Sequence, residues 1–253
     1  KQVIGTKAPK DKDFPILIKF IDAKQSLSVQ VHPDDKYALL HEGESGKTEM
    51  WYVMDATPDA TLIYGFTHEI SHQEFERRIK DNTLLEVCNQ VPIKKGDVFF
   101  IEAGTLHAIG AGALIAEIQQ SSNSTYRVYD YGRVGKDGKL RELHIEKALA
   151  VTKLEPPTRK PEPIAKLTAF ADYDLTILAQ CELFNVSHFD LHGNCSLNAK
   201  KDSFHSILVL DGQIRLTYGN DSFTITKGES VFIPADMGEY ILNGTGEFIL
   251  TTL

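Results

Sequence analysis

Four side chains in this 253-residue sequence combine the chemistry of metal ligands with a supporting context. Gln30 and His32 lie two apart in the alternating run LSVQVH, and residues two apart on a β-strand point to the same face. Glu49 follows a polar loop, and His107 lies far along the chain in GDVFFIEAGTLHAIGAG. Two imidazoles, a carboxylate and an amide oxygen could hold Zn²⁺ or another divalent ion and leave positions for water or substrate.

The alternative is that each histidine is an ordinary polar residue near a turn. A structural zinc site more often uses cysteines, whereas Cys88, Cys181 and Cys195 are widely spaced and form no CxxC pair. The sequence therefore favours a catalytic metal over a structural one. The odd number of cysteines also argues against a disulfide framework and favours a reducing, cytoplasmic setting.

The composition narrows the class of partner. A formal net charge of −8 argues against nucleic acid or an anionic membrane as the main partner. The sequence contains neither an apolar run of membrane-spanning length nor a signal peptide. A small molecule is therefore the expected partner, and an anionic one would need local basic residues.

Segments with β pattern dominate the chain. Strands are predicted from Phe14 to Asp22, over 27–32, 50–56 and 61–66, and from 91 to 131. Helices are predicted over 34–42, 68–90 and 140–154, the second beginning with a capping box of Ser71 and Glu74. Four prolines in EPPTRKPEP indicate a crossing segment, and short strands fill 164–253, which is typical of a sandwich or barrel.

Two nine-residue segments resemble each other. KGDVFFIEA at 95–103 parallels KGESVFIPA at 227–235, and the same spacing places Glu239 opposite His107. A good hairpin turn alone could explain the shared KG[DE], but the match continues through Phe, Ile and Ala. We therefore predict two related β-barrels: a metal-binding catalytic domain over 14–155, a proline-rich crossing segment over 156–163, and a metal-free domain over 164–253.

The surroundings of His107 resemble a known motif. Gly96, Glu102, Gly104 and His107 follow the spacing of the second cupin motif, with Glu102 in place of the usual proline. The segments QVHPDD, GKTEMWYV, AGTLHAIGAG and QQSSNSTYRVYDYGR, in this order, resemble the type I phosphomannose isomerases in their short bacterial form. The resemblance is strongest from residue 14 to about residue 155.

This resemblance implies a mainly β fold of two cupin (double-stranded β-helix, or jelly-roll) barrels with a helical insertion near 68–90. It implies one Zn²⁺ per chain, held by Gln30, His32, Glu49 and His107, and a sugar phosphate as partner. The reaction would interconvert mannose 6-phosphate and fructose 6-phosphate by proton transfer through an enediol. Family members usually carry a further N-terminal segment, so the chain is expected to lack part of the first barrel. The expected oligomeric state is a monomer or a homodimer.

Lys47 and Arg127 are the expected catalytic residues. Lys47 lies two residues before Glu49, and relatives assign acid–base work to the matching lysine; a solvated loop lysine is the alternative. A nearby metal ion would disfavour its ammonium form. Arg127 could stabilise the enediolate or grip the phosphate, or instead pair with Asp130.

Three further residues are expected to contact the substrate. Ser28 and Lys19 match positions that relatives use for phosphate. Asn123 lies where many relatives carry an acidic residue for proton handling, so Lys47 would have to be the base alone if that carboxylate is essential.

Two other functions fit part of the pattern. A non-catalytic bicupin could bind a sugar phosphate without turning it over. An iron-dependent cupin oxygenase would generally use more histidines, and Gln30 fits it poorly.

Overall fold

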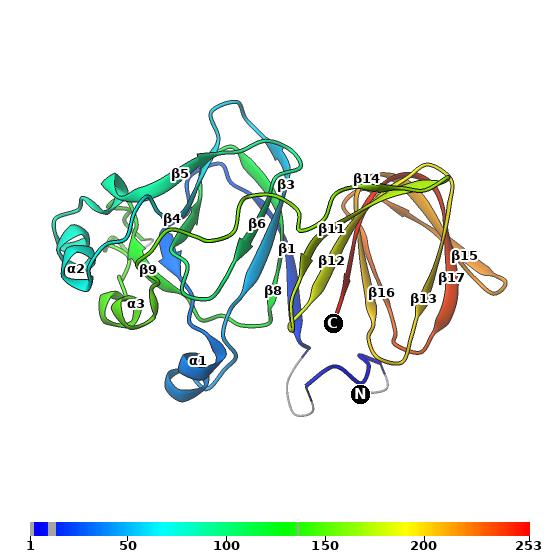
Figure 1. Ribbon diagram of the computed structural model, residues 1–253, viewed down its shortest axis with the longest axis horizontal. Coiled ribbons are helices and arrows are strands. Elements are labelled where there is room, and N and C mark those ends of the chain that lie inside the picture. Colours follow the sequence, from blue (N-terminus) through cyan, green and yellow to red (C-terminus); the bar gives the residue numbers. More distant parts are fainter. Residues whose placement is uncertain (1–2, 10–13, 136) are drawn as a thin grey trace. The chain divides into compact units, whose positions relative to one another are not determined.

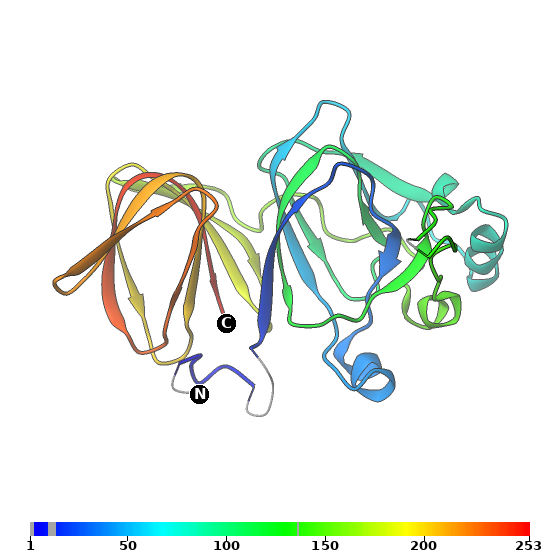
Figure 2. The same ribbon diagram turned by 180° about the vertical axis from the view of Figure 1, so that it is seen from behind.

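The computed structural model describes residues 3–9, 14–135 and 137–253. The chain divides into two compact units: Ile16–Pro161, called here the site unit, and a C-terminal unit in which Glu162–Leu253 are joined by the N-terminal residues up to Pro15. Strands form the body of each unit, as Figures 1 and 2 show. The predicted mainly β fold is confirmed, whereas closure of each unit into a barrel stays a prediction.

The site unit contains two antiparallel sheets. The four-stranded sheet has the order β1-β8-β3-β6, with bounds β1 Ile16–Asp22, β8 Ala113–Gln120, β3 Glu49–Ala56 and β6 Val98–Ile101. The five-stranded sheet has the order β5-β4-β7-β2-β9, with bounds β5 Cys88–Pro92, β4 Thr61–Phe66, β7 His107–Ile109, β2 Val29–Val31 and β9 Tyr126–Tyr129.

Register in the four-stranded sheet places polar residues in rows across neighbouring strands. Glu117 of β8 lies opposite Lys19 of β1 and Trp51 of β3. Two residues further along β8, Gln119 lies opposite Glu49 of β3. Because side chains alternate along a strand, these residues share one face of the sheet.

The described residues of the site unit form three α-helices: α1 Asp35–His41, α2 His72–Lys80 and α3 Ile145–Val151. Asp34 caps α1 by accepting a hydrogen bond from Tyr37 N–H, and Ser71 caps α2 by accepting from Glu74 N–H. Both caps satisfy backbone donors that have no partner within the helix, and the predicted cap at Ser71 is confirmed. In the described chain no helix has the length and apolarity needed to cross a membrane.

The prediction of helix over 68–90 is wrong in its extent. The helix ends at Lys80, and Asn82 takes the left-handed conformation with φ 60°. A short 3₁₀ turn at Leu84–Glu86 follows, and Cys88–Pro92 is strand β5, paired with β4. Periodicity alone does not separate a helical run from a short turn plus strand, because Leu84 is buried in either case.

The C-terminal unit contains one strand-rich sheet with the order β10-β11-β12-β17-β14-β15, and β13 and β16 also pair with β17 and β14. Its bounds are β10 Thr168–Ala169, β11 Tyr173–Gln180, β12 Asn185–Leu191, β13 Asn194–Ala199, β14 His205–Tyr218, β15 Asp221–Thr226, β16 Ser230–Ile233 and β17 Gly238–Thr252. The sequence echo lies in matching places: Gly96 and Gly228 have φ 93° and 85° in the turns before β6 and β16. Only glycine adopts this conformation readily, so the echo includes a real backbone requirement.

Replacing Phe75 with alanine should destabilise the site unit. Phe75 is fully buried and packs edge-on against Phe66 at 5.7 Å between ring centroids. Truncation of such a side chain costs about 3–5 kcal/mol. Leu40→Ala is the matched control, because Leu40 is 78% exposed and should change stability by less than about 0.5 kcal/mol. Urea unfolding measures both, and equal effects would contradict the described packing.

Candidate metal centre and active site

His32, Glu49 and His107 converge in the interior of the site unit. Their ligand atoms all lie within 4.8 Å of one another, and Nε2 of His32 is 3.1 Å from Nε2 of His107. Glu49 Oε1 is 3.4 Å from His32 Nε2. Each residue is at most 1% exposed, so none of these groups can rely on bulk water.

A hydrogen bond from Nδ1 orients each of the two imidazole rings. Nδ1 of His32 lies 2.9 Å from Ser124 O, and Nδ1 of His107 lies 2.8 Å from Thr105 O. A carbonyl oxygen only accepts, so each Nδ1 donates its hydrogen, and the two Nε2 atoms are left to face each other. Burial, and then the charge of His32, lower the pKa of His107 to about 3, so this imidazole is neutral. Two ring nitrogens 3.1 Å apart need a proton or a cation between them.

Glu49 supplies the negative charge of the cluster. Its Oε2 accepts from Trp51 Nε1 at 3.1 Å. Its buried Oε1 has no hydrogen-bond partner among the described residues, although Lys47 Nζ lies 3.0 Å away as an ion pair. Burial raises the pKa of the Glu49 carboxyl, but the charges of His32 and Lys47 outweigh it and the net pKa is lowered. An ionised, unbonded oxygen beside two imidazole nitrogens is a donor set that suits Zn²⁺.

Gln30 completes the predicted ligand set at its edge. Its backbone pairs with His107 across β2 and β7, and its side-chain Nε2 lies 3.4 Å from His107 Nε2. Half a turn of the amide would bring Oε1 to that place, and Oε1 is the atom that could bind a metal. The structure thus brings together all four residues that the sequence singled out.

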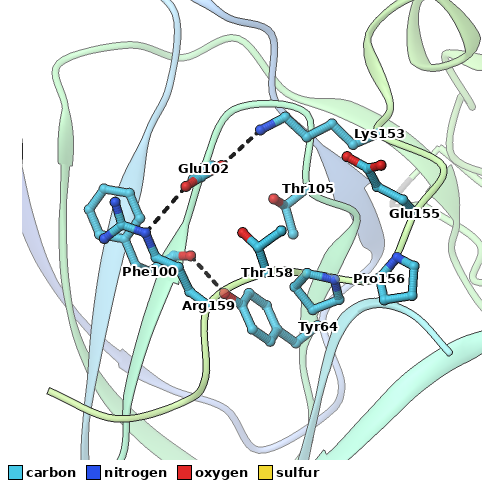
Figure 3. Close-up of a pocket in the computed structure, with 11 residues that line it drawn as sticks. Tyr64, Phe100, Glu102, Thr105, Lys153, Glu155, Pro156, Thr158 and Arg159 are labelled. Atoms are coloured by element: carbon cyan, nitrogen blue, oxygen red, sulfur yellow. Dashed lines mark hydrogen bonds and ion pairs between the residues drawn. The ribbon is translucent and has the colours of Figure 1, made fainter. Parts of the chain in front are cut away.

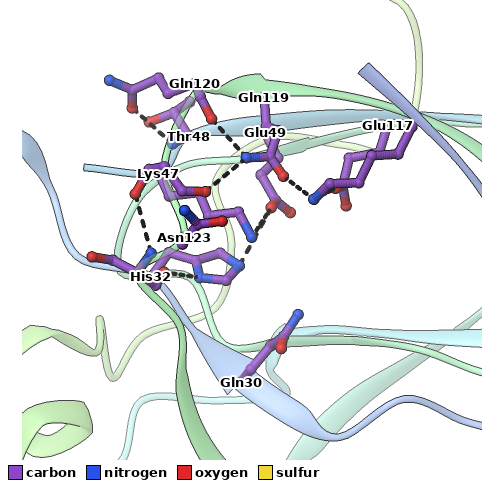
Figure 4. Close-up of polar contacts among 12 residues, drawn as sticks. Gln30, His32, Lys47, Thr48, Glu49, Glu117, Gln119, Gln120 and Asn123 are labelled. Atoms are coloured by element: carbon purple, nitrogen blue, oxygen red, sulfur yellow. Dashed lines mark hydrogen bonds and ion pairs between the residues drawn. The ribbon is translucent and has the colours of Figure 1, made fainter. Parts of the chain in front are cut away.

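Lys47 is part of this interior. It is 6% exposed, and Figure 4 shows its side chain reaching Glu49 beside His32. The alternative of a solvated loop lysine is therefore wrong.

Glu117 was not among the predicted site residues. It is 4% exposed, its Oε1 pairs with Lys19 Nζ at 2.9 Å, and its Oε2 accepts from Trp51 Nε1 at 3.1 Å. Burial, and then the negative charge of Glu49, raise its pKa. A carboxylate in the middle of the apolar run ALIAEIQQ was the signal in the sequence, since such a side chain is rarely buried without a partner.

The predicted substrate residues are less uniformly placed. Lys19 is held by Glu117 and by Gln119 Oε1 at 2.5 Å, so its charge is already compensated. Ser28 is 6% exposed and directly precedes β2. Asn123 is exposed, and its backbone N–H donates to Glu44. Among the described residues no hydrogen bond or ion pair joins Ser28 or Asn123 to His32, Glu49 or His107.

Arg127 lies next to the cluster on β9, where its backbone pairs with Gln30. Its Nη1 donates to Glu142 O at 2.8 Å, and its buried Nε makes no hydrogen bond within the described residues. Burial, and then the nearby charge of Arg141, lower its pKa.

Asp130, the alternative partner, instead forms ion pairs with Arg133 and with Arg141, the latter at 3.2 Å. The guanidinium groups of Arg127, Arg133 and Arg141 thus all lie near the Asp130 carboxylate. This is a locally positive region in a chain of net charge −8.

A surface pocket lies beside the segment that leads out of the site unit (Figure 3). Its Glu102 pairs with Lys153 at 2.8 Å and with Arg159 at 3.2 Å, while Arg159 also stacks 4.0 Å above the Phe100 ring. Glu102 stands where the cupin motif has proline, and the structure gives it a role in fastening this segment. The pocket's two cations are occupied by this pairing, so the interior cluster remains the candidate active site.

A β fold whose interior gathers two imidazoles and a carboxylate is that of a cupin able to hold a metal ion. Two family models match the chain: phosphomannose isomerase type I, catalytic domain, over residues 1–63, and mannose-6-phosphate isomerase, cupin domain, over residues 174–253.

Relatives and solved structures agree with these matches. Mannose-6-phosphate isomerase ManA of Bacillus subtilis is 41% identical over 95% of this chain and 75% of its own length. The mannose-6-phosphate isomerase of Streptococcus mutans is 38% identical over 95% of this chain and 74% of its own. A crystal structure of the Bacillus subtilis mannose 6-phosphate isomerase superposes with a TM-score of 0.89 at 35% identity, covering 97% of this chain and 77% of that one. The chain belongs to the type I mannose-6-phosphate isomerase family and is an isomerase of the cupin class.

Zinc should stabilise the folded site unit. An ion that binds only the folded state at about 100 times its dissociation constant adds about 2.7 kcal/mol. His107→Ala removes one donor and should abolish the effect, whereas His68→Ala, at an exposed position, should keep it. Urea unfolding with and without Zn²⁺ measures the gain. An undiminished gain in His107→Ala would contradict the assigned centre.

Proposed function

We propose that this protein interconverts mannose 6-phosphate and fructose 6-phosphate by moving a proton between C2 and C1 through an enediol. The observation that carries the proposal is the convergence of His32, Glu49 and His107 beside the buried Lys47. Family membership supplies the substrate, and the site supplies groups suited to the chemistry.

The donor set supports one Zn²⁺ per chain, held by His32, Glu49, His107 and, after an amide turn, Gln30. Zinc bound there would polarise the oxygens of the open-chain sugar and so make the proton next to the carbonyl more acidic. The buried surroundings exclude water, which strengthens every charge interaction in the site.

Two groups are suited to handle the proton. The amine of Lys47 lies 3.0 Å from Glu49, and its burial restricts it to the reacting side of the sheet. Glu117 has a raised pKa, which suits a carboxyl that holds and releases a proton. Many relatives carry an acidic residue where Asn123 stands, and Glu117 offers a carboxyl group for the same work.

The arginine-rich region supports phosphate binding. A phosphomonoester dianion pairs well with a guanidinium group. The planar guanidinium can donate two hydrogen bonds at once to two phosphate oxygens. Arg127 neighbours Gln30 on the sheet, and Arg133 and Arg141 add positive charge nearby. Lys19, by contrast, is engaged by Glu117, so we assign the phosphate chiefly to Arg127, with Ser28 as a lesser candidate.

The cellular compartment and the oligomeric state are further parts of the proposal. All three cysteines are free thiols, which supports a reducing, cytoplasmic environment. A monomeric or homodimeric state stays a prediction.

Lys47→Met should lower kcat for mannose 6-phosphate by about 10²–10⁴-fold, since a positioned acid–base group contributes that much. Lys153→Met is the matched control, because Lys153 pairs with Glu102 outside the cluster and should retain near-normal turnover. A coupled assay of fructose 6-phosphate formation measures both. Sugar-phosphate binding with no turnover in the unaltered protein would instead favour the non-catalytic bicupin.

Arg127→Met should raise KM for mannose 6-phosphate by roughly 10–100-fold, because a hydrogen bond to a charged group is worth about 1.5–3 kcal/mol. Arg78→Met offers a control on the surface of α2, where Arg78 pairs with Glu74 at 2.8 Å. Steady-state kinetics on the two variants separates KM from kcat. An unchanged KM with a lowered kcat would move Arg127 from phosphate binding to the enediolate.

A further inference from the structure

Trp51 is the largest fully buried side chain of the described residues and the single tryptophan of the sequence. If Trp51 only filled space in the core, a phenylalanine side chain could pack there as well. The indole, however, carries an N–H that must find an acceptor once it is buried. The acceptors here are two carboxylates, Glu49 and Glu117.

The contacts of this N–H are symmetric. Nε1 lies 3.1 Å from Glu49 Oε2 and 3.1 Å from Glu117 Oε2. Both arise from the strand geometry: Glu49 is two residues before Trp51 on β3, and Glu117 lies directly opposite it on β8. The ring also meets His107 edge-on, with 5.3 Å between centroids and 79° between planes.

We propose that Trp51 is a positioning residue: its indole N–H fixes the Glu49 carboxylate for metal binding and joins it to Glu117. Holding Oε2 leaves Oε1 as the atom that faces His32 and Lys47, and Oε1 is the oxygen without a hydrogen bond. Glu117 is in turn held by Lys19 on its other side. Lys19, Glu117 and Trp51 therefore form a row across three strands that braces the metal ligand from behind.

The consequence concerns metal affinity. Groups that orient a ligand through a hydrogen bond typically account for 10–100-fold in affinity. Without the indole donor, Glu49 Oε2 would be a buried charged oxygen with no hydrogen bond, and the carboxylate could turn away from the imidazoles. The loss should appear in metal binding even though the ring volume is kept.

An isosteric replacement tests this inference, which rests on the metal site of the proposed function. Growth of a tryptophan-requiring host on β-(3-benzothienyl)alanine replaces the indole N–H with sulfur at this one position, because the chain has no other tryptophan. Competition with a chelator measures the Zn²⁺ affinity of the metal-free protein. We expect a 10–100-fold weaker affinity, with the circular dichroism spectrum unchanged.

Phe99→Leu is the control for general damage to this part of the core. Phe99 is fully buried and lies opposite Trp51 on β6, but its ring packs against Tyr64 and makes no hydrogen bond. Its zinc affinity should stay within about twofold of the unaltered protein. An equal loss in both proteins, or no loss in the benzothienyl protein, would overturn the inference.

A direct view of the N–H gives a second readout. The single indole N–H yields one cross-peak in a ¹⁵N-correlated spectrum, and we expect it to shift both on Zn²⁺ addition and in Glu117→Gln. A cross-peak that responds to neither would overturn the shared hydrogen bond. If the unaltered protein bound no Zn²⁺, the metal site of the proposed function would fail and this inference with it; equal affinities with and without the indole N–H would overturn the inference alone.

Discussion

Burial of three mutually close donor groups is the constraint on which the site unit depends. Two imidazole nitrogens 3.1 Å apart and an ionised carboxylate are placed where water cannot solvate them. Such an arrangement is unfavourable unless a cation or proton is shared among its members. The surrounding structure must therefore hold the donors together, and a divalent ion bound among them would offset the free-energy cost of burying them.

The donor side chains are held in place by hydrogen bonds to groups that are not themselves metal ligands. Carbonyl oxygens of Ser124 and Thr105 fix the two imidazoles, and the indole of Trp51 fixes the carboxylate. Thr105 and Trp51 each lie two residues from the ligand they hold, whereas Ser124 lies 92 residues from His32. Antiparallel register then explains why Glu117 joins the site, since it lies opposite Trp51 on the neighbouring strand.

The sequence predicted what depends on local pattern and motif spacing. The cap at Ser71 and the mainly β class followed from capping chemistry and strand alternation, and the resemblance to the isomerase family named the four side chains that converge in the site unit. What depends on strand pairing did not follow: Glu117 is defined by its cross-strand neighbours, and Arg133 and Arg141 by their shared Asp130. The over-long helix after His72 shows the same limit, because only pairing with β4 makes Cys88–Pro92 a strand.

The central claim is that one metal ion, held by this cluster, is required for isomerisation by the neighbouring side chains. Titrating metal-free protein with Zn²⁺ while recording bound metal and mannose 6-phosphate turnover tests it most directly. The account predicts that activity rises in proportion to bound zinc and reaches its plateau at about one ion per chain, the number that a single four-donor site can hold. Full activity in the metal-free protein would contradict it.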